Sequence, residues 1–521
     1  TRGNSLNVEL NDQSILNFYY ALFPTIENFR PPARLMKFPH VGITCLDDSG
    51  RILSFKDQTF VDRTILQRKV DLPVVLIESQ EDNLFNEEFG IMVPGENENF
   101  KQEGRDWERP ARILLYNDDE ILLDAEVGIR IHGHATRDLP QKSLKVYFRP
   151  KYDSLKFPGH FLNRDHDLNR VLVRSFHSDF IGNEFTDFGF RDDLVMRIIG
   201  EENLVYGQRS RPCVVFLNGE YWGIYSLHEA TDDDFIAGIE DLTADEITLL
   251  SGPESGYFAS RPVRHLDLDD AMERRRFEQF YDFENLVDYF LFQTFFANTD
   301  WPHNNIKFWH KTNTDLPYKF ILFDMDATFK FPGQNPFTRL NSEAGFTSRY
   351  PSKYYQLYDV LLNSDHFIQS LRKRYFDLRN DLLAPERMLG LAREWKESIE
   401  PHILDQKERW HYPRRKRDWE KSFEEIEHFI VTRQLHFDQF INDLTPSVIF
   451  PNPSSTGILQ LKESDKTHYS SVAVFDLTGM KLFESDIQEG SFDLSDLSGR
   501  GMVIVKLYGN FGSRVERVLL P

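Results

Sequence analysis

The chain of 521 residues contains only two cysteines and no long apolar run. Cys45 and Cys213 fit neither a disulfide framework nor a zinc-site spacing, so we expect two buried thiols. Because no stretch of about 18 apolar residues occurs, no segment is expected to span a membrane. Basic residues are outnumbered, and the net charge of −22 argues against a nucleic-acid partner, since phosphate backbones bind to basic grooves.

Several signatures of known enzyme classes are also missing. No Gly-x-Ser-x-Gly elbow is present, which leaves serine-hydrolase chemistry without support. Neither a P-loop nor the glycine-rich motif of protein kinases is spelled out. The acidic runs from Asp232 to Asp234 and from Asp267 to Asp270 lack EF-hand spacing, so we expect solvated faces. His132 and His134 share a predicted strand face but lack a third metal ligand, which favours satisfied histidines.

The sequence has ample apolar material for more than one core, with 40% apolar residues and 45 phenylalanines. We expect three parts and an α+β fold class. Residues 1–69 read as an irregular segment with β-like runs. Residues 70–444 read as one domain that is β-rich at first and helical later. Residues 445–521 alternate in short strands, which is typical of a small β-sandwich.

Local patterns place several elements within these parts. Period-two alternation predicts a strand over 142–148. Asn218-Gly219 predicts a tight hairpin between two apolar strands. Helices are predicted over 191–199 and over 284–297. Charged, amphipathic helices are expected over 355–445.

A compact set of oxygen ligands follows the predicted helix over 284–297. Asp300 lies five positions before Asn305, and Asp324 and Asp326 come at the end of an apolar strand. Residues two apart in a strand share a face, so these two carboxylates are expected to point the same way. Such a pair repels unless a cation relieves it, and Mg²⁺ binds one or two carboxylates together with waters and phosphates.

This spacing matches the polar groups of a phosphoryl-transfer site. Asp300 could accept or orient the proton of an attacking hydroxyl, and Asn305 could offer a neutral oxygen to a metal. A structural interpretation is equally open, in which Asn298 caps the helix and Asp300 to Pro302 form a turn. The two interpretations are compatible.

Lys142 is the candidate lysine for such a site. It shares its predicted strand face with three apolar residues, and a lysine in those surroundings needs a partner. Glu229, which ends another predicted strand, is expected to pair with it. Lys145 lies on the opposite face and reads as an ordinary solvated lysine. Gly128 and the polar run 133–137 could cover phosphates.

Four separated motifs, in the family's order, resemble the CotH-type spore-coat kinases. They lie within 104–110, 128–145, 217–229 and 298–324. The resemblance covers about 70–440. It implies an atypical protein-kinase-like fold with a β-rich N-terminal lobe and a helical C-terminal lobe. It also implies transfer of the γ-phosphate of ATP to Ser or Thr of coat or surface proteins.

The resemblance carries residue roles as well. It implies that Lys142 contacts the ATP phosphates, that Glu229 positions this lysine, and that Asp300 is the catalytic aspartate. Asn305 and Asp324 would then hold Mg²⁺ or Mn²⁺.

Three further assignments complete the predicted site. The strand argument adds Asp326 to the metal ligands. We also assign Arg130 and Arg137 as candidate ATP-binding residues.

The C-terminal part resembles a second family. Phe450-Pro451-Asn452-Pro453, with the runs 474–479 and 494–499, is similar to the sorting domain of type IX secretion in Bacteroidetes. This resemblance implies recognition by the secretion machinery and a secreted or outer-surface protein, although the chain itself shows no leader peptide.

ATP is scarce outside cells, so three functions stay open at this stage. The first is a metal-dependent kinase of exported proteins. The second is a catalytically idle surface scaffold with a kinase-like fold. The third is a transferase that moves AMP to protein hydroxyls. The retained set of polar residues favours an enzyme over a scaffold.

Overall fold

The structure is a computed structural model. Of the segment 1–69 it describes little beyond one hairpin, made of β1 (His40–Leu46) and β2 (Ile52–Thr59). The residues described are 35–38, 40–46, 52–59, 70–117, 120–181, 184–185, 188–200, 205–251, 266–302, 304–340, 353–444, 449–450, 454, 456–461, 469–509 and 512–520.

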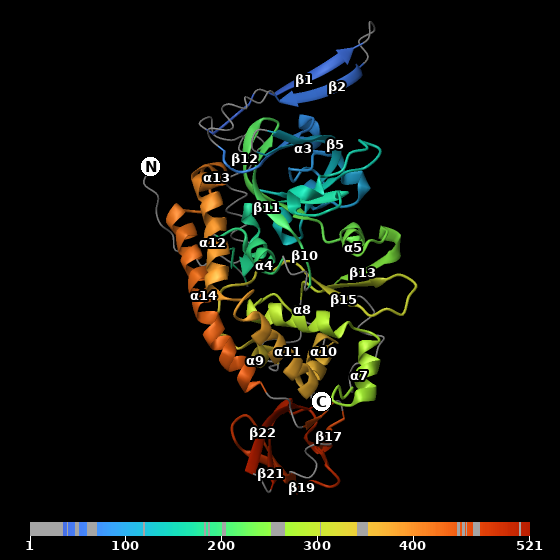
Figure 1. Ribbon diagram of the computed structural model, residues 1–521, viewed down its shortest axis with the longest axis vertical. Coiled ribbons are helices and arrows are strands. Elements are labelled where there is room, and N and C mark those ends of the chain that lie inside the picture. Colours follow the sequence, from blue (N-terminus) through green and yellow to red (C-terminus); the bar gives the residue numbers. More distant parts are fainter. Residues whose placement is uncertain are drawn as a thin grey trace.

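A closed β-barrel lies directly below this hairpin in Figure 1. The strand order is β11-β12-β7-β6-β5-β4-β3. Strands β11 and β3 are parallel and close the barrel, whereas the other neighbours are antiparallel. The strands are β3 (Val74–Glu78), β4 (Arg109–Asn117), β5 (Glu120–His132), β6 (Ser143–Tyr147), β7 (Arg170–Ser175), β11 (Ser210–Leu217) and β12 (Glu220–Glu229).

The predicted hairpin at Asn218-Gly219 is confirmed. Leu217 pairs with Glu220 across the turn. Asn218 has φ of 48° and Gly219 has φ of 78°. Both values lie in the left-handed region that a two-residue hairpin of this type requires, and asparagine and glycine adopt it most readily.

Alternation along the barrel strands separates an apolar interior from a mixed exterior. Val171 and Val173 point inward and are fully buried. Their neighbours Arg170 and Arg174 therefore lie on the outer face of β7. Lys145 lies on the outer face of β6, opposite Arg130 of β5 and Leu172 of β7. One side of the barrel exterior is thus lined with cations.

A second sheet lies beside this cationic face. Its order is β10-β15-β14-β13, in which β10 and β15 are parallel and the other pairs antiparallel. Helix α5 (Asp233–Glu240) packs on it through a small apolar core. The strands are β10 (Tyr206–Gly207), β13 (Ile247–Ser251), β14 (Lys307–Lys311) and β15 (Lys319–Leu322).

Helix α8 (Phe283–Phe295) runs through the middle of the remaining, mostly helical part (Figure 1). Eleven of its thirteen residues are buried, which matches the core helix predicted over 284–297. Arg433 holds its C-terminal end, because the buried guanidinium donates to the carbonyls of Thr294 and Phe295, both at 2.7 Å. A cation at this end of a helix also meets the negative pole of the helix dipole.

The other helices surround α8 and the barrel. Helix α4 (Arg191–Ile199) has the bounds predicted from the sequence. The charged helices expected over 355–445 are also present. The helices are α3 (Glu81–Phe85), α7 (Ala271–Glu278), α9 (Pro336–Leu340), α10 (Lys353–Leu362), α11 (Asp365–Leu378), α12 (Pro385–Ile399), α13 (Ile403–Trp410) and α14 (Lys416–Asp443).

The last strands form two sheets around a core of their own, at the bottom of Figure 1. One sheet has the order β16-β17-β20 and the other β19-β18-β21-β22. The predicted opening motif at 451–453 lies outside the described residues. The strands are β16 (Ile449–Phe450), β17 (Ile458–Leu461), β18 (Tyr469–Phe475), β19 (Lys481–Asp486), β20 (Ser491–Asp493), β21 (Met502–Gly509) and β22 (Gly512–Leu519).

The predicted α+β class is confirmed by this mixture of sheets and helices. Two short strands, β8 (Phe180–Ile181) and β9 (Glu184–Phe185), form a further sheet of their own. Cys213 is a buried free thiol, as expected. Cys45 lies in β1, and its side chain is outside the description. Among the described residues, no helix has the length and apolarity to cross a bilayer.

Candidate functional site

The loop after α8 is held in place by its own side chains. Asn298 is fully buried, donates from Nδ2 to Gln293 Oε1 at 2.9 Å and accepts the backbone N–H of Asp300 at 3.0 Å. Trp301 is also fully buried and packs edge-on against Phe290. The backbone N–H of Asn298 also donates to the Gln293 carbonyl at 3.1 Å, so Asn298 closes the C-terminal end of α8 and its side chain positions Asp300.

Asp300 and Asn305 lie side by side, as their spacing predicts. Asn305 Nδ2 donates to Asp300 Oδ2 at 2.8 Å, and Asn304 Nδ2 donates to Oδ1 at 3.1 Å. Asn305 has φ of 58°, which places it in the left-handed region that asparagine tolerates. Its Oδ1 makes no hydrogen bond within the described residues and is available as a neutral oxygen ligand.

Asp324 and Asp326 do come together, but not for the reason predicted. Strand β15 ends at Leu322, and Asp324 has φ of 55°, so the strand alternation invoked for the two aspartates is wrong. A turn brings them together instead. Asp192, in the first turn of α4, fixes this turn by accepting the Met325 N–H at 2.6 Å.

Arg174 links the carboxylates of three aspartates. Its Nη1 donates to Asp192 at 2.8 Å, and its Nη2 donates to Asp324 at 3.2 Å and to Asp326 at 3.5 Å. The Arg174 and Asp326 side chains are each 12% exposed, whereas that of Asp324 is 39% exposed. The most open carboxylate of the group is therefore Asp324.

Electrostatic interactions tie this group to Asp300. Loss of solvent raises the pKa of Asp324, and repulsion from Asp192 and Asp300 raises it further, against the pull of Arg174. Burial and the neighbouring Asp324 raise the pKa of Asp326 well above its usual value. These carboxylates crowd one another beyond what Arg174 alone relieves, which is the situation that a metal cation stabilises.

Lys142 does not reach this group. Its Nζ donates to the carbonyls of Arg137 at 2.7 Å and Leu139 at 2.9 Å, and lies 4.0 Å from the Phe100 ring centroid. Burial lowers the pKa of Lys142 to about 7. Its apolar strand neighbours face the barrel interior, so Lys142 serves the folding of the loop at this end of the barrel.

The predicted ion pair between Lys142 and Glu229 is wrong. Glu229 is buried and bound by Arg164, with Nε at 2.5 Å and Nη2 at 2.8 Å, and it also accepts the Arg209 N–H at 2.7 Å. Glu229 therefore ends β12 in a structural ion pair.

The two assigned arginines are also engaged elsewhere. Arg137 donates to the carbonyls of Gly133, Phe100 and Gln102 at 2.5, 3.1 and 3.0 Å. Arg130 lies on the same barrel face as Lys145, 4.1 Å from the Tyr147 ring centroid and 3.7 Å from Glu108. Arg137 thus holds a loop, and Arg130 borders the cationic face.

Lys145, which the sequence analysis expected to be a solvated lysine, lies on the same outer face of the barrel as Arg174. Its Nζ pairs with Asp232 Oδ2 at 2.9 Å, and both side chains are less than one fifth exposed. Asp232 also caps α5 by accepting the Phe235 N–H. The sequence contained a signal for a cationic outer face of the barrel. Arg170 and Arg174 alternate with Val171 and Val173, so burial of the two valines places both arginines on the outer face.

The run Asp232 to Asp234 is not a solvated face. Its carboxylate oxygens lie within 4.8 Å of one another. Arg170 pairs with all three carboxylates at 2.8 to 3.0 Å. The three carboxylates of this run therefore share two cations, Arg170 and Lys145.

Lys307, the first residue of β14, is a second lysine beside the site. Its Nζ donates to Thr231 O at 2.9 Å and Oγ1 at 2.8 Å. Burial lowers the pKa of Lys307 to about 8, while attraction to Asp232 and Asp324 opposes this. Lys307 thus lies between the Lys145–Asp232 ion pair and the turn that carries Asp324.

We call the resulting group the polar centre. One side carries cations from the barrel and β14, and the other carries oxygen ligands from the ends of α8 and β15. Hard divalent cations such as Mg²⁺ prefer these oxygens, and lysines and arginines bind phosphates. The polar centre consists of Lys145, Arg174, Asp192, Asp232, Asp300, Asn305, Lys307, Asp324 and Asp326.

The sequence of this region matches a known family. The model of the CotH kinase protein family matches residues 129–250 and 263–436, more than half of the chain. The chain belongs to the CotH kinase family. Every residue of the polar centre falls within the matched ranges.

Comparison with solved structures gives a weaker likeness. A crystal structure of the Helicobacter pylori proinflammatory kinase CtkA is similar over 57% of this chain and 95% of that chain, with 11% identity and a TM-score of 0.25. We transfer no residue role from a likeness of this strength. A search of curated proteins found no match.

Replacing Arg174 should separate its two effects on the polar centre. In Arg174→Gln, we expect the melting temperature in EDTA to fall by several degrees, because breaking a buried ion pair costs about 3–5 kcal/mol. Excess Mn²⁺ should then raise the melting temperature more in the variant than in the wild type, since the metal replaces the lost positive charge.

Arg164→Gln is the matched control for this experiment. It also breaks a buried arginine–carboxylate pair, but it leaves only the single carboxylate of Glu229. We expect it to lower the melting temperature without enlarging the response to Mn²⁺. An equal response to Mn²⁺ in both variants would contradict a metal site at Asp324 and Asp326.

Proposed function

We propose that the chain is a metal-dependent atypical protein kinase that transfers the γ-phosphate of ATP to Ser or Thr of exported proteins. The observation that carries the proposal is that Asp300, Asn305 and Asp324 lie close together and that Lys307 links Asp324 electrostatically to the Lys145–Asp232 pair, inside the region matched by the CotH kinase family. In this proposal the barrel forms the N-terminal lobe and the helices around α8 form the C-terminal lobe. ATP would bind between them.

Each residue type suits one task in phosphoryl transfer. Lys145 would contact the ATP phosphates. Asp232 would hold this lysine in position, which is the role that the sequence analysis gave to Glu229 for Lys142. Lys307 would add a second positive charge. Asn305, Asp324 and Asp326 would hold Mg²⁺ or Mn²⁺, which supplies charge neutralisation to the phosphates when bound.

Asp300 would act on the acceptor. Its carboxylate is fixed by the amides of Asn304 and Asn305 and can accept a hydrogen bond from a Ser or Thr hydroxyl. The hydroxyl oxygen then attacks the γ-phosphorus, the bond to the β–γ bridging oxygen breaks, and ADP leaves. The hydroxyl proton passes to Asp300. Lys145 and Lys307 stabilise the charge that develops on the phosphate oxygens.

Labelled ATP distinguishes this proposal from the alternatives. With purified protein, an exported-protein substrate and Mg²⁺ or Mn²⁺, γ-labelled ATP should label protein and α-labelled ATP should not. Asp324→Asn should reduce this labelling at least ~100-fold, because it removes a charged ligand of the metal. Asparagine also tolerates the positive φ of this position, so the fold should persist.

The exposed Asp315→Asn is the control, since it makes the same change in the loop before β15. It should label like the wild type. Label from α-ATP would instead indicate AMP transfer, and no label together with no ATP binding would indicate a scaffold.

Two lysine variants test which lysine acts on ATP. Lys145→Met should lower γ-phosphate transfer by ~100-fold or more, because removal of one preorganised donor costs about that much. The melting temperature should change little, because Asp232 keeps its ion pair with Arg170. Lys142→Met should keep the transfer rate and lower the melting temperature, because it leaves two loop carbonyls without their donor. Loss of transfer in Lys142→Met together with normal transfer in Lys145→Met would instead indicate that Lys142 contacts the ATP phosphates.

We further propose that the sheets after α14 are a sorting domain for type IX secretion, which would direct the protein to the outer surface or medium. Support comes from the motif resemblance and from the separate apolar core of these sheets. A chain that ends at Leu444 should keep γ-phosphate transfer and remain inside a bacterium that has this secretion system. Secretion of the truncated chain would refute the sorting role.

A further inference from the structure

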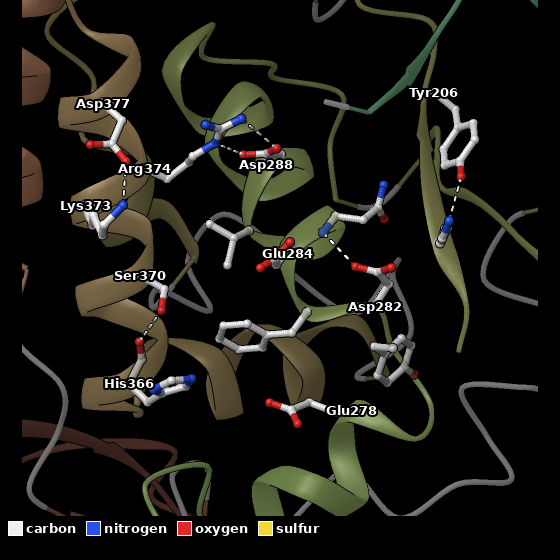
Figure 2. Close-up of a pocket in the computed structure, with 15 residues that line it drawn as sticks. Tyr206, Glu278, Asp282, Glu284, Asp288, His366, Ser370, Lys373, Arg374 and Asp377 are labelled. Carbon is white, nitrogen blue, oxygen red and sulfur yellow. Dashed lines mark hydrogen bonds and ion pairs between the residues drawn. The ribbon is translucent and has the colours of Figure 1, made fainter. Parts of the chain in front are cut away.

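A cavity of about 1010 Å³ lies away from the polar centre, at the opposite end of α8 (Figure 2). Helices α7 and α11, the start of α8 and strand β15 form its walls. Five carboxylates line it, and we call it the acidic groove. These are Glu278, Asp282, Glu284, Asp288 and Asp377.

The cations that line the acidic groove are already paired. Arg374 holds Asp288 at 2.6 and 3.2 Å, and Lys373 holds Asp377 at 2.7 Å, as the dashed lines in Figure 2 show. Lys319 donates to the Tyr206 hydroxyl at 3.0 Å and lies 3.6 Å from Glu240.

Three carboxylates remain without a cation. Glu278, Asp282 and Glu284 form no ion pair within the described residues. Burial raises the pKa of Asp288, and repulsion from Glu284 and Asp282 adds to this against the pull of Arg374. Burial lowers the pKa of His366, which disfavours a positive charge on this imidazole. The groove thus carries an excess of negative charge.

Aromatic side chains lie among these carboxylates. The Phe283 ring stacks on His366 with centroids 5.0 Å apart, and Tyr206 and Tyr281 also line the groove. Guanidinium groups bind carboxylates through paired hydrogen bonds and lie flat on aromatic rings. Both features fit an arginine side chain, and a lysine fits the carboxylates.

Helix α8 sets the distance between the groove and the polar centre. Its thirteen residues, at a rise of 1.5 Å per residue, span ~20 Å. An extended peptide covers that distance in roughly six residues, at about 3.3 Å each. A substrate could therefore occupy both places at once if a basic segment lay six or more residues from the acceptor hydroxyl.

We propose that the acidic groove binds a basic segment of the protein substrate through Arg or Lys side chains. The role of the groove in substrate recognition rests on the proposed kinase function, whereas its binding of a basic peptide does not. Charge complementarity favours this occupant, because the carboxylates of Glu278 and Glu284 have no partner within the described residues, whereas that of Asp282 accepts the Asn285 N–H at the start of α8.

Direct binding tests the proposal without any phosphate transfer. The probe is a fluorescein-labelled eight-residue peptide of alternating Arg and Gly, titrated with the full chain and followed by fluorescence anisotropy. The double variant Glu278→Gln/Glu284→Gln should weaken binding ~10-fold or more. Both residues are exposed and unpaired, so the fold should be unaffected.

The control addresses the acidity of the whole chain, whose net charge is −22. Glu397→Gln/Glu424→Gln makes the same charge change at exposed positions of α12 and α14, outside the groove. It should leave binding unchanged. Equal weakening in both variants, or no weakening in the groove variant, would overturn the proposal. So would binding of spermine at this site without binding of the peptide.

Asp324→Asn separates this inference from the proposed function. It should bind the peptide like the wild type while losing phosphate transfer. For substrates that carry a basic segment, the groove variant should raise KM and leave kcat unchanged. If the wild type binds the peptide but never transfers phosphate, the kinase proposal fails and the groove remains. An unchanged KM in an active enzyme overturns the role of the groove in substrate binding.

Discussion

The ion pairs of Arg174 are the interaction on which the polar centre depends. One guanidinium on a barrel strand meets Asp192 of α4 and the two aspartates of the turn after β15. These three segments are far apart in the sequence. Removing such charges from water is costly, and the attraction offsets this only when the geometry is good and the remaining hydrogen bonds are made. Asp192 meets this condition, because its second oxygen accepts the Met325 N–H. The ion pairs of Arg174 therefore join three segments that are distant in the sequence.

The two sides of the polar centre carry opposite signs, and this division follows from the fold. The barrel exterior and β14 contribute Lys145 and Lys307, whereas the ends of α8 and β15 contribute carboxylates and an amide. A metal–nucleotide complex also presents two signs, since its phosphates are negative and its metal is positive. A cationic wall facing an oxygen-rich wall can orient such a complex through charge alone. The fold thus provides the electrostatic pattern before any ligand is bound.

Elements with strong local signals could be predicted from the sequence, and long-range partners could not. The hairpin at Asn218-Gly219 and the helix over 191–199 follow from turn chemistry and helix ends, and both are observed. The predicted proximity of Asp300 and Asn305 is also confirmed, because two side chains five positions apart in one loop stay close together. The pairing of Lys142 with Glu229 was wrong, since alternation tells which residues share a face but not which face lies inside a barrel. Closure of that barrel depends on the pairing of β11 with β3, which no local pattern reveals.

The buried Trp301 has a consequence for how such a protein could be controlled. Its ring is enclosed by Phe290 and Tyr358 next to Asp300, so the loop is ordered as soon as the core forms. Many signalling enzymes order a different segment, the activation loop, by modification. For Asp300 and Trp301 the cost of ordering is met during folding. In the proposed kinase, Asp300 would therefore be in place without a modification of its loop.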